Sequence, residues 1–450
     1  MRNLTVHFTS SLTKKTSLII ILTFTIIVVL DSTILKFAAY TGIELPTISN
    51  IGIFLAFSLL FSLICILFMH IARKNSESTY IFPINLKYFH IFFFSNQILI
   101  LCILFTIILQ MILLNKYNII LVRTDTYLSF ISSLIFLILL VFIFVGWFKS
   151  KRNYKILLFA ISFSLLAIDL VISLVYLDAY FSRPIKPDIN PYPITSFVTN
   201  FAGSALNQQL AFVLDILSIL SFSFMWIATA LLLSHYRYKL GKIKFFIFIC
   251  IPLIYYLFPF EAYFGNTFFS FILDSPLIFG ILYILLFSAT KQIGALFFSL
   301  FFLIVSTLVA KSKIRQSILI SGIGMAIIFG SLEIATLQYS VYPPFGIITA
   351  IFMPLGSYLL FIGVLSSAQN ISRNIEIRKE LYKNANRELD LLKEIGIAQM
   401  ENELLKKYKS IAKHSTNSES VYNVDLEQGE IKEILQDILN ELSKTNRTRR

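Results

Sequence analysis

The sequence predicts an all-α fold: a polytopic membrane bundle of about ten transmembrane helices, followed by a cytosolic amphipathic, coiled-coil-like helical tail. The first observation is composition, because 57% of the 450 residues are hydrophobic and the mean hydropathy is +0.78, which is too apolar for a soluble protein. The second is a succession of apolar runs of membrane-spanning length within residues 1–365. The third is the balanced charge of residues 366–450, which hold 15 Lys and Arg against 14 Asp and Glu.

Apolar runs of about 20 residues, the length of a transmembrane helix, define the elements of the bundle, which we place in residues 1–365. Nine runs are clear: 17–35, 50–70, 91–114, 128–148, 156–177, 209–234, 245–258, 317–338 and 346–365. Two more, 268–288 and 293–310, lie between the seventh and the eighth. No small-residue cleavage site follows the first run, so we expect an uncleaved anchor there.

Basic residues predict the orientation of the bundle. Residues 1–365 contain 23 Lys and Arg against 11 Asp and Glu. Most of this excess lies in the loops at 73–87, 149–155, 237–244 and 311–315. Positive loops stay on the cytoplasmic side, so we expect these loops, the N-terminus and the tail there, in a plasma membrane.

The same rule limits the number of crossings. An even number of crossings must separate the loops at 237–244 and 311–315, yet three apolar runs lie between them. We expect the run interrupted by Asp274 and Pro276 to be a re-entrant or broken helix, with Lys291 at the turn after it, which gives ten crossings. An eleventh crossing, with an exception to the charge rule, stays open. Lys291 also has a simpler interpretation as a loop lysine.

Four carboxylates lie within the predicted membrane helices: Asp31, Asp169, Asp215 and Glu333. Ionisable groups at membrane depth are costly, so they are candidates for function. The predicted orientation puts all four in the outer half of the bilayer, where they would line one acidic pocket for a cation or an amine. The alternative is that each meets headgroup water or a neighbouring polar side chain.

The tail divides into two parts. Apolar residues recur about once per helical turn from Ile371 to Ile411, and no Gly or Pro separates the last apolar run from them. We therefore expect residues 366–412 to form a cytosolic helix continuous with the last membrane helix. Residues 413–450 contain a polar break and a short amphipathic C-terminal helix. The heptad register is not constant, so a long coiled coil does not follow.

Several classes of function lack support in the sequence. No P-loop, dinucleotide-binding turn, metalloprotease motif or nucleophile elbow is present, so we expect neither an enzyme nor a bound cofactor. Cys65, Cys102 and Cys250 lie singly in apolar runs, without metal-ligand spacing, so we expect no metal site. The balanced tail has no basic face for nucleic acid.

A group of short motifs in residues 236–399 and just beyond resembles a known family. The most specific is Tyr342-Pro343-Pro344-Phe345-Gly346, followed by Ser366-Ser367-Ala368; the others are Asp274-Ser275-Pro276, Leu286-Phe287-Ser288-Ala289-Thr290-Lys291, Gly356-Ser357-Tyr358-Leu359 and Gly396-Ile397-Ala398-Gln399-Met400-Glu401. In these motifs the chain resembles a family of functionally uncharacterised multi-pass membrane proteins that occurs as many paralogues in ammonia-oxidising archaea. The resemblance implies the membrane architecture and an archaeal plasma membrane, and it implies no catalytic residue.

These observations lead to two expectations of function. The first is a membrane sensor or signalling adaptor, in which the state of the bundle passes down the last membrane helix to the tail. Its partners would be the lipid bilayer, a cytosolic protein on residues 366–450 and, in one version, a second copy of the chain. The alternative is a transporter or channel for a small cation or amine that uses the intramembrane carboxylates.

Overall fold

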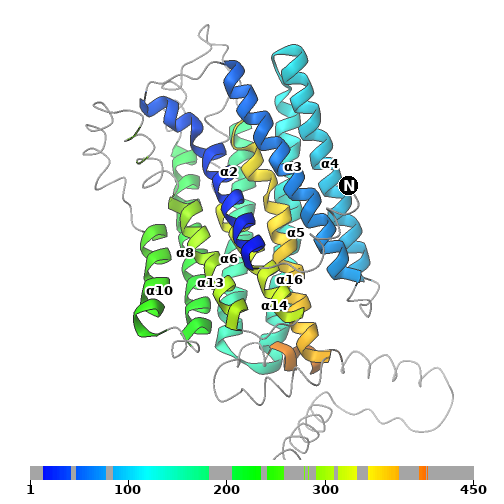
Figure 1. Ribbon diagram of the computed structural model, residues 1–450, viewed down its shortest axis with the longest axis vertical. Helices are drawn as coiled ribbons and strands as arrows, with labels where there is room; N and C mark the ends of the chain where they lie inside the picture. The colour runs from blue at the N-terminus through cyan, green and yellow to red at the C-terminus, as the bar shows by residue number, and fades with distance from the viewer. Residues whose placement is uncertain are drawn as a thin grey trace, which may run out of the picture.

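The structure of the protein is a computed structural model, and within the residues that it describes it is all helical. These are residues 14–41, 47–77, 85–181, 205–234, 241–257, 278, 282, 290–308, 313–331, 343–373, 395–401 and 403. The helices lie side by side in one bundle (Figure 1). In chain order they are α2 (Lys14–Thr41), α3 (Thr47–Glu77), α4 (Asn85–Leu114), α5 (Ile119–Lys151), α6 (Tyr154–Phe181), α8 (Ala205–Ser234), α10 (Lys242–Leu257), α13 (Thr290–Leu308), α14 (Lys313–Gly330), α15 (Ile347–Ile351) and α16 (Met353–Arg373).

Six of the described helices are long and apolar enough to cross a membrane. They cover Ser49–Met69, Tyr88–Leu114, Ile119–Lys151, Tyr154–Asp178, Phe212–Leu231 and Ile347–Ser372. Shorter apolar helices cover Leu18–Asp31, Ile293–Ile304 and Ile314–Gly330. Large apolar side chains are exposed on the outside of the bundle, as on α4 and α5, where hydrocarbon rather than water is the natural solvent. The protein is therefore a helical membrane protein.

The consecutive helices α5 and α6 run antiparallel, as their contacts show. Arg123 near the start of α5 pairs with Asp178 near the end of α6, whereas Phe144 near the end of α5 contacts Phe159 near the start of α6. The pair α14 and α16 shows the same reversal. This up-and-down order brings the ends of distant helices together at each end of the bundle.

The last apolar helix lies at the centre of the bundle. In its most apolar 18-residue window 94% of the residues are buried, against 28% to 56% in the other five long helices. In Figure 1 it is the yellow helix α16, surrounded by α2, α3, α5 and α14. A central helix touches most of its neighbours, so its position depends on all of them.

Glycines let α14 and α16 pack with their backbones in contact. A β-carbon on Gly324 would lie 2.5 Å from the backbone nitrogen of Leu360. A β-carbon on Gly363 would lie 2.3 Å from Ser321 Oγ and 2.6 Å from the Ser321 backbone nitrogen. Small residues at such crossings replace the hydrophobic effect as the source of helix association in lipid.

Two predicted boundaries differ from the structure. The run 346–365 was expected as one helix, but it divides at Phe352 into α15 and α16. Pro354 lacks an N–H, so it cannot continue the hydrogen-bond ladder of α15 and instead occupies the first turn of α16. The fourth helix was expected from residue 128 but begins at Ile119, where the side chain of Asn118 caps it by accepting from the Ile120 N–H at 3.0 Å.

Candidate functional site

The end of the central helix at the top of Figure 1 is held by a carboxylate from α2. Asp31 of α2 is buried, and its Oδ2 accepts hydrogen bonds from the Thr349 backbone N–H at 2.9 Å and from Thr349 Oγ1 at 2.8 Å. The N-cap of α15 is Gly346, with φ +90°, which has no side chain to satisfy these donors. Asp31 therefore caps α15 from another helix.

Aromatic rings hold the same end of the helix in place. Phe352, at the break between α15 and α16, meets Phe24 of α2 and Phe61 of α3 edge to face, with centroids 5.0 and 4.6 Å apart. Phe345, just before α15, meets Phe54 of α3 at 5.9 Å. Edge-to-face contacts are favourable and directional, so a shift of α15 must disturb α2 and α3.

A second buried carboxylate, Asp125 of α5, lies at the same end of the bundle. Its side chain is fully buried, and neither carboxylate oxygen has a hydrogen-bond partner among the described residues. Asp125 lies eleven residues before Phe136, which is three helical turns and therefore the same face of α5. Phe136 contacts Tyr358 and Phe361 of α16, so this face of α5 points to the central helix.

Of the four predicted carboxylates, the three that the structure describes lie in different environments. Asp31 is buried against α15, and Asp169 is buried on α6, where it has an interaction partner. Asp215 is exposed on α8. The structure therefore does not bring Asp31 and Asp215 together, and Glu333 lies outside the described residues.

The predicted re-entrant turn is described only in part. Asp274 and Pro276 lie outside the described residues. Lys291 lies in the first turn of α13, which begins at Thr290. It was expected at a turn between two runs, but its backbone is helical.

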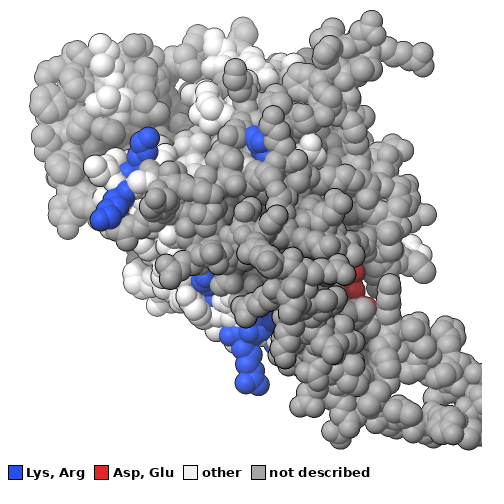
Figure 2. Space-filling view, turned by 60° about the horizontal axis from the view of Figure 1, so that its bottom comes forward, with Lys and Arg blue, Asp and Glu red and all other residues white. Residues whose placement is uncertain are grey.

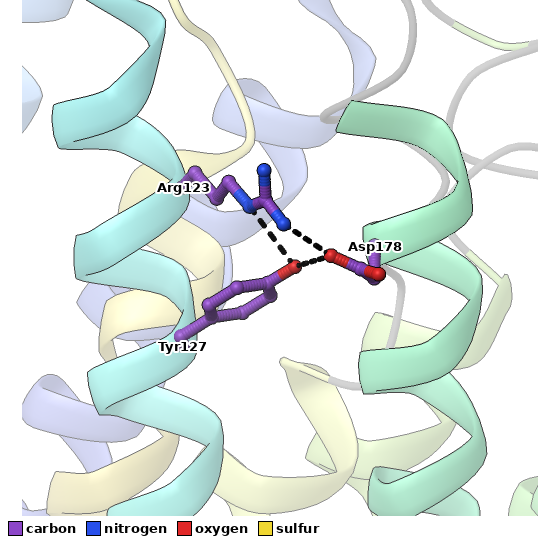
Figure 3. Close-up of polar contacts among 3 residues, drawn as sticks. All are labelled: Arg123, Tyr127 and Asp178. Carbon is purple, nitrogen blue, oxygen red and sulfur yellow. Dashed lines mark hydrogen bonds and ion pairs between the residues drawn. The ribbon is translucent and has the colours of Figure 1, made fainter. Parts of the chain in front are cut away.

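An exposed polar cluster connects the start of α5 to the end of α6. Arg123 forms an ion pair with Asp178, Tyr127 donates to Asp178 Oδ1 at 2.5 Å, and Arg123 Nε donates to Tyr127 Oη at 3.2 Å (Figure 3). The guanidinium also lies 5.4 Å from the Tyr127 ring centroid. Both charged side chains are accessible to solvent, so the cluster is a surface ion pair that connects two helices.

At the opposite end, residues 395–401 pack against the end of the central helix. These residues, which we call the docked segment, are helical and lie beside the lower end of α16 in Figure 1, where they are orange. Gly396 is so close to α16 that a β-carbon there would lie 2.2 Å from Ile371 Cγ2. Ala398 of the segment is fully buried.

Polar contacts attach the docked segment to the end of α5. Trp147 Nε1 donates to Gln399 Oε1 at 3.1 Å, Ser150 Oγ donates to Glu401 Oε2, and Lys151 forms an ion pair with Glu401 Oε1. The segment thus contacts both α5 and α16. Figure 2 shows this end of the bundle, where most of the described charged side chains are Lys and Arg.

The docked segment corrects the prediction for residues 366–412. The central helix does continue past Leu365, to Arg373 among the described residues. In one straight helix, however, residues 371 and 396 would be about 37 Å apart, whereas the structure puts them in contact. A single straight rod from Ser366 to Ala412 is therefore wrong.

Sequence reasoning missed Asp125 and the docked segment. Asp125 fell outside the predicted helices because the fourth was expected from residue 128, although Ile119-Ile120-Leu121-Val122 is an apolar start and Asn118 a suitable cap. The motif Gly396-Ile397-Ala398-Gln399-Met400-Glu401 was noted for its resemblance. Its small residues at 396 and 398 were the available signal for close packing.

Comparison with known proteins supplies no function, so the function has to be argued from these residues. No family model, no curated protein and no solved structure matches the chain.

Proposed function

We propose that the protein is a membrane sensor or signalling adaptor, in which α15 and α16 pass a change at the outer end of the bundle to the docked segment. One observation carries this proposal: Asp31 binds one end of this helical unit, and Gly396 of the docked segment contacts its other end. Each end is held by side chains from other helices. A change at either end therefore acts on a shared element.

The proposal includes a topology of ten crossings. Ten helical units from α2 to α15–α16 lie in the described part of the chain, and α10 and α13 are antiparallel neighbours, with Phe248 near Phe301 and Tyr255 near Phe297. An even number of crossings between α10 and α13 agrees with this pairing. The basic end of the bundle is then cytoplasmic, together with both termini, in the plasma membrane.

Tight packing supports transmission through the central helix. Its contact with α14 is backbone to backbone at Gly324 and Gly363, so small shifts cannot be absorbed by side-chain movement there. Packed helices shift as units rather than deform continuously. Releasing Thr349 from Asp31 is thus expected to change the position of Ile371, on which the docked segment rests.

The output of this sensor is the docked segment. While it is docked, Gln399 and Glu401 are occupied by α5. Once it is released, these side chains become available to a cytosolic partner protein, which we place on residues 366–450. In a second arrangement with the same chemistry, the released tail binds a second copy of the chain and forms a homodimer.

Fluorescence of Trp147 tests the proposal. The chain has two tryptophans, so Trp226→Phe leaves Trp147 alone as a reporter of the docked segment. Asp31→Leu, which removes the cap of α15, is expected to increase acrylamide quenching of Trp147 in nanodiscs. Asp178→Asn, which removes a charge from the exposed cluster between α5 and α6, is the matched control. Equal quenching in all three proteins would rule out transmission through α16.

A second candidate function is transport of a small cation or amine. The observation that favours it is Asp125, whose buried carboxylate has no partner among the described residues. Flux into proteoliposomes separates the two functions. Transport would be lost in Asp125→Asn and retained in a chain without residues 395–450, whereas a sensor shows no flux in either.

A further inference from the structure

Asp125 is a carboxylate that the fold buries without a partner. Its side chain is fully inaccessible, and both oxygens lack a hydrogen-bond partner within the described part of the chain. The nearby hydroxyls of α5 are directed elsewhere: Thr126 Oγ1 donates to the Val122 carbonyl and Ser129 Oγ to the Asp125 carbonyl, at 2.8 and 2.9 Å. An ionised carboxylate in such a setting is strongly unfavourable unless a counter-charge or a proton neutralises it.

The charged groups near this end of α5 are already engaged. On α5 itself, Arg123 pairs with Asp178, and Tyr127 donates to the same carboxylate. In this antiparallel pairing, Asp125 lies at the level of Tyr176 on α6. The other titratable residue at that level of α6 is Asp178. None of these is an available cation.

Among the described residues, the other helices against this end of α5 supply no cation either. The short helix α15 contains only Ile, Thr and Ala. Phe93 of α4 contacts Phe136 of α5, and this antiparallel pairing puts Asp125 at the level of Leu104 on α4. The nearest titratable residue on α4 is Cys102, which is exposed on the outside of the bundle. Asp31 approaches α15 from α2 and is itself acidic.

A row of buried polar atoms continues from Asp125 along the same face. Ser132 of α5 and Gln97 of α4 lie at one level by the same pairing, and both are buried with no oxygen or nitrogen partner among the described residues. About two helical turns before Gln97 on α4, His90 Nδ1 lies 2.5 Å from Tyr358 Oη. Buried polar atoms in native proteins usually bind ordered water, so this row is suited to waters that exchange protons.

We propose that Asp125 is a proton-binding site, with one proton on its carboxyl group and ordered water between it and the level of Ser132 and Gln97. Binding converts a carboxylate and a proton from the outer water into a neutral carboxylic acid, and release reverses this. A neutral acid needs no counter-ion, which explains the absence of one around Asp125 in the described structure. This site stands on Asp125 alone and does not depend on the signalling function.

Labelling with dicyclohexylcarbodiimide tests the proposal on the full chain in proteoliposomes. This reagent partitions into the membrane and reacts with protonated carboxyl groups. We expect Asp125 to be modified at pH 6 at least tenfold faster than Asp178, and the modification to slow as the pH rises. Mass spectrometry of peptides reports each site. Asp125→Asn should abolish labelling of that peptide only.

Two outcomes would overturn the proposal. One is the absence of label on Asp125 at every pH from 5 to 9 in folded protein. The other is protection of Asp125 by sodium or potassium ions at constant pH, which would make it a cation site. Thermal unfolding is the second readout: Asp125→Asn, the neutral isostere of the acid, is expected to unfold at the wild-type temperature at pH 6. A large loss would mean that a carboxylate charge is required.

Discussion

Gly396 and Ile371, twenty-five residues apart, are packed so closely that a β-carbon on Gly396 would come within 2.2 Å of Ile371 Cγ2. The contact joins the docked segment to the end of the central helix. Because the neighbouring Gln399 and Glu401 bind α5, the segment connects two helices that meet at the basic end of the bundle. The state of the central helix and the position of the tail are therefore linked by direct contact.

Gly396→Ala is expected to release the docked segment. The added methyl group overlaps Ile371, and overpacking of this kind typically costs about 1–3 kcal/mol. Hydrogen exchange of residues 395–401 should become faster. Ile371→Ala removes Cγ2 but keeps Cβ, which would still lie 2.8 Å from the added β-carbon, so the double variant should regain part of the protection. Failure of this rescue would show that Gly396 is needed for a reason other than close packing.

Glu401→Gln is expected to weaken docking by about 1.5–3 kcal/mol, the range for a hydrogen bond to a charged group. The change removes the charge that faces Lys151. Quenching of Trp147 in the Trp226→Phe background should rise, and added salt should affect the wild type more than the variant. Glu403→Gln, which alters a side chain that accepts a hydrogen bond from Gln399, is the control. Equal effects of the two variants would contradict the role of Lys151.

Gly363→Ala is expected to destabilise the bundle. Its methyl group would lie 2.3 Å from Ser321 Oγ and 2.6 Å from a backbone nitrogen that cannot move without α14. A loss of about 1–3 kcal/mol is expected from overpacking. Gly146→Ala is the matched control, because nothing lies within 4 Å of that position. Thermal unfolding in detergent should separate the two, and similar midpoints would argue against the tight α14–α16 crossing.

Asp31→Leu is expected to destabilise the outer end by about 1–3 kcal/mol, because it leaves the buried Thr349 N–H without an acceptor. Asp31→Asn keeps an acceptor and loses only the charge near the start of α15, so its cost should be smaller. Unfolding midpoints at pH 7 report both. An Asn variant as unstable as the Leu variant would mean that charge, rather than capping, is what Asp31 contributes.

Much of the fold was predictable because membrane helices must satisfy their backbone internally and expose apolar side chains. These two requirements alone predict the positions of most apolar runs, for example those of α6 and α8. The end of a helix is harder to predict, because capping residues such as Asn118 extend it beyond the apolar core. Asp125 was missed for this reason.

The site could be predicted only in part. Asp31 was identified as a membrane carboxylate, but its role depends on Gly346, which is more than 300 residues away and leaves α15 without a cap of its own. The docked segment was even harder to predict, because its amphipathic pattern fits a free helix as well as a packed one. Only the contacts of Gly396 and Glu401 distinguish the two.

The measurement that tests the central claim most directly is hydrogen exchange of residues 395–401 in four proteins: wild type, Asp31→Leu, Glu401→Gln and the double variant, all in nanodiscs. Coupling through α15 and α16 predicts faster exchange in Asp31→Leu than in wild type, and no further increase when Asp31→Leu is added to Glu401→Gln. Exchange in Asp31→Leu equal to that of wild type, with only Glu401→Gln accelerating it, would contradict the account.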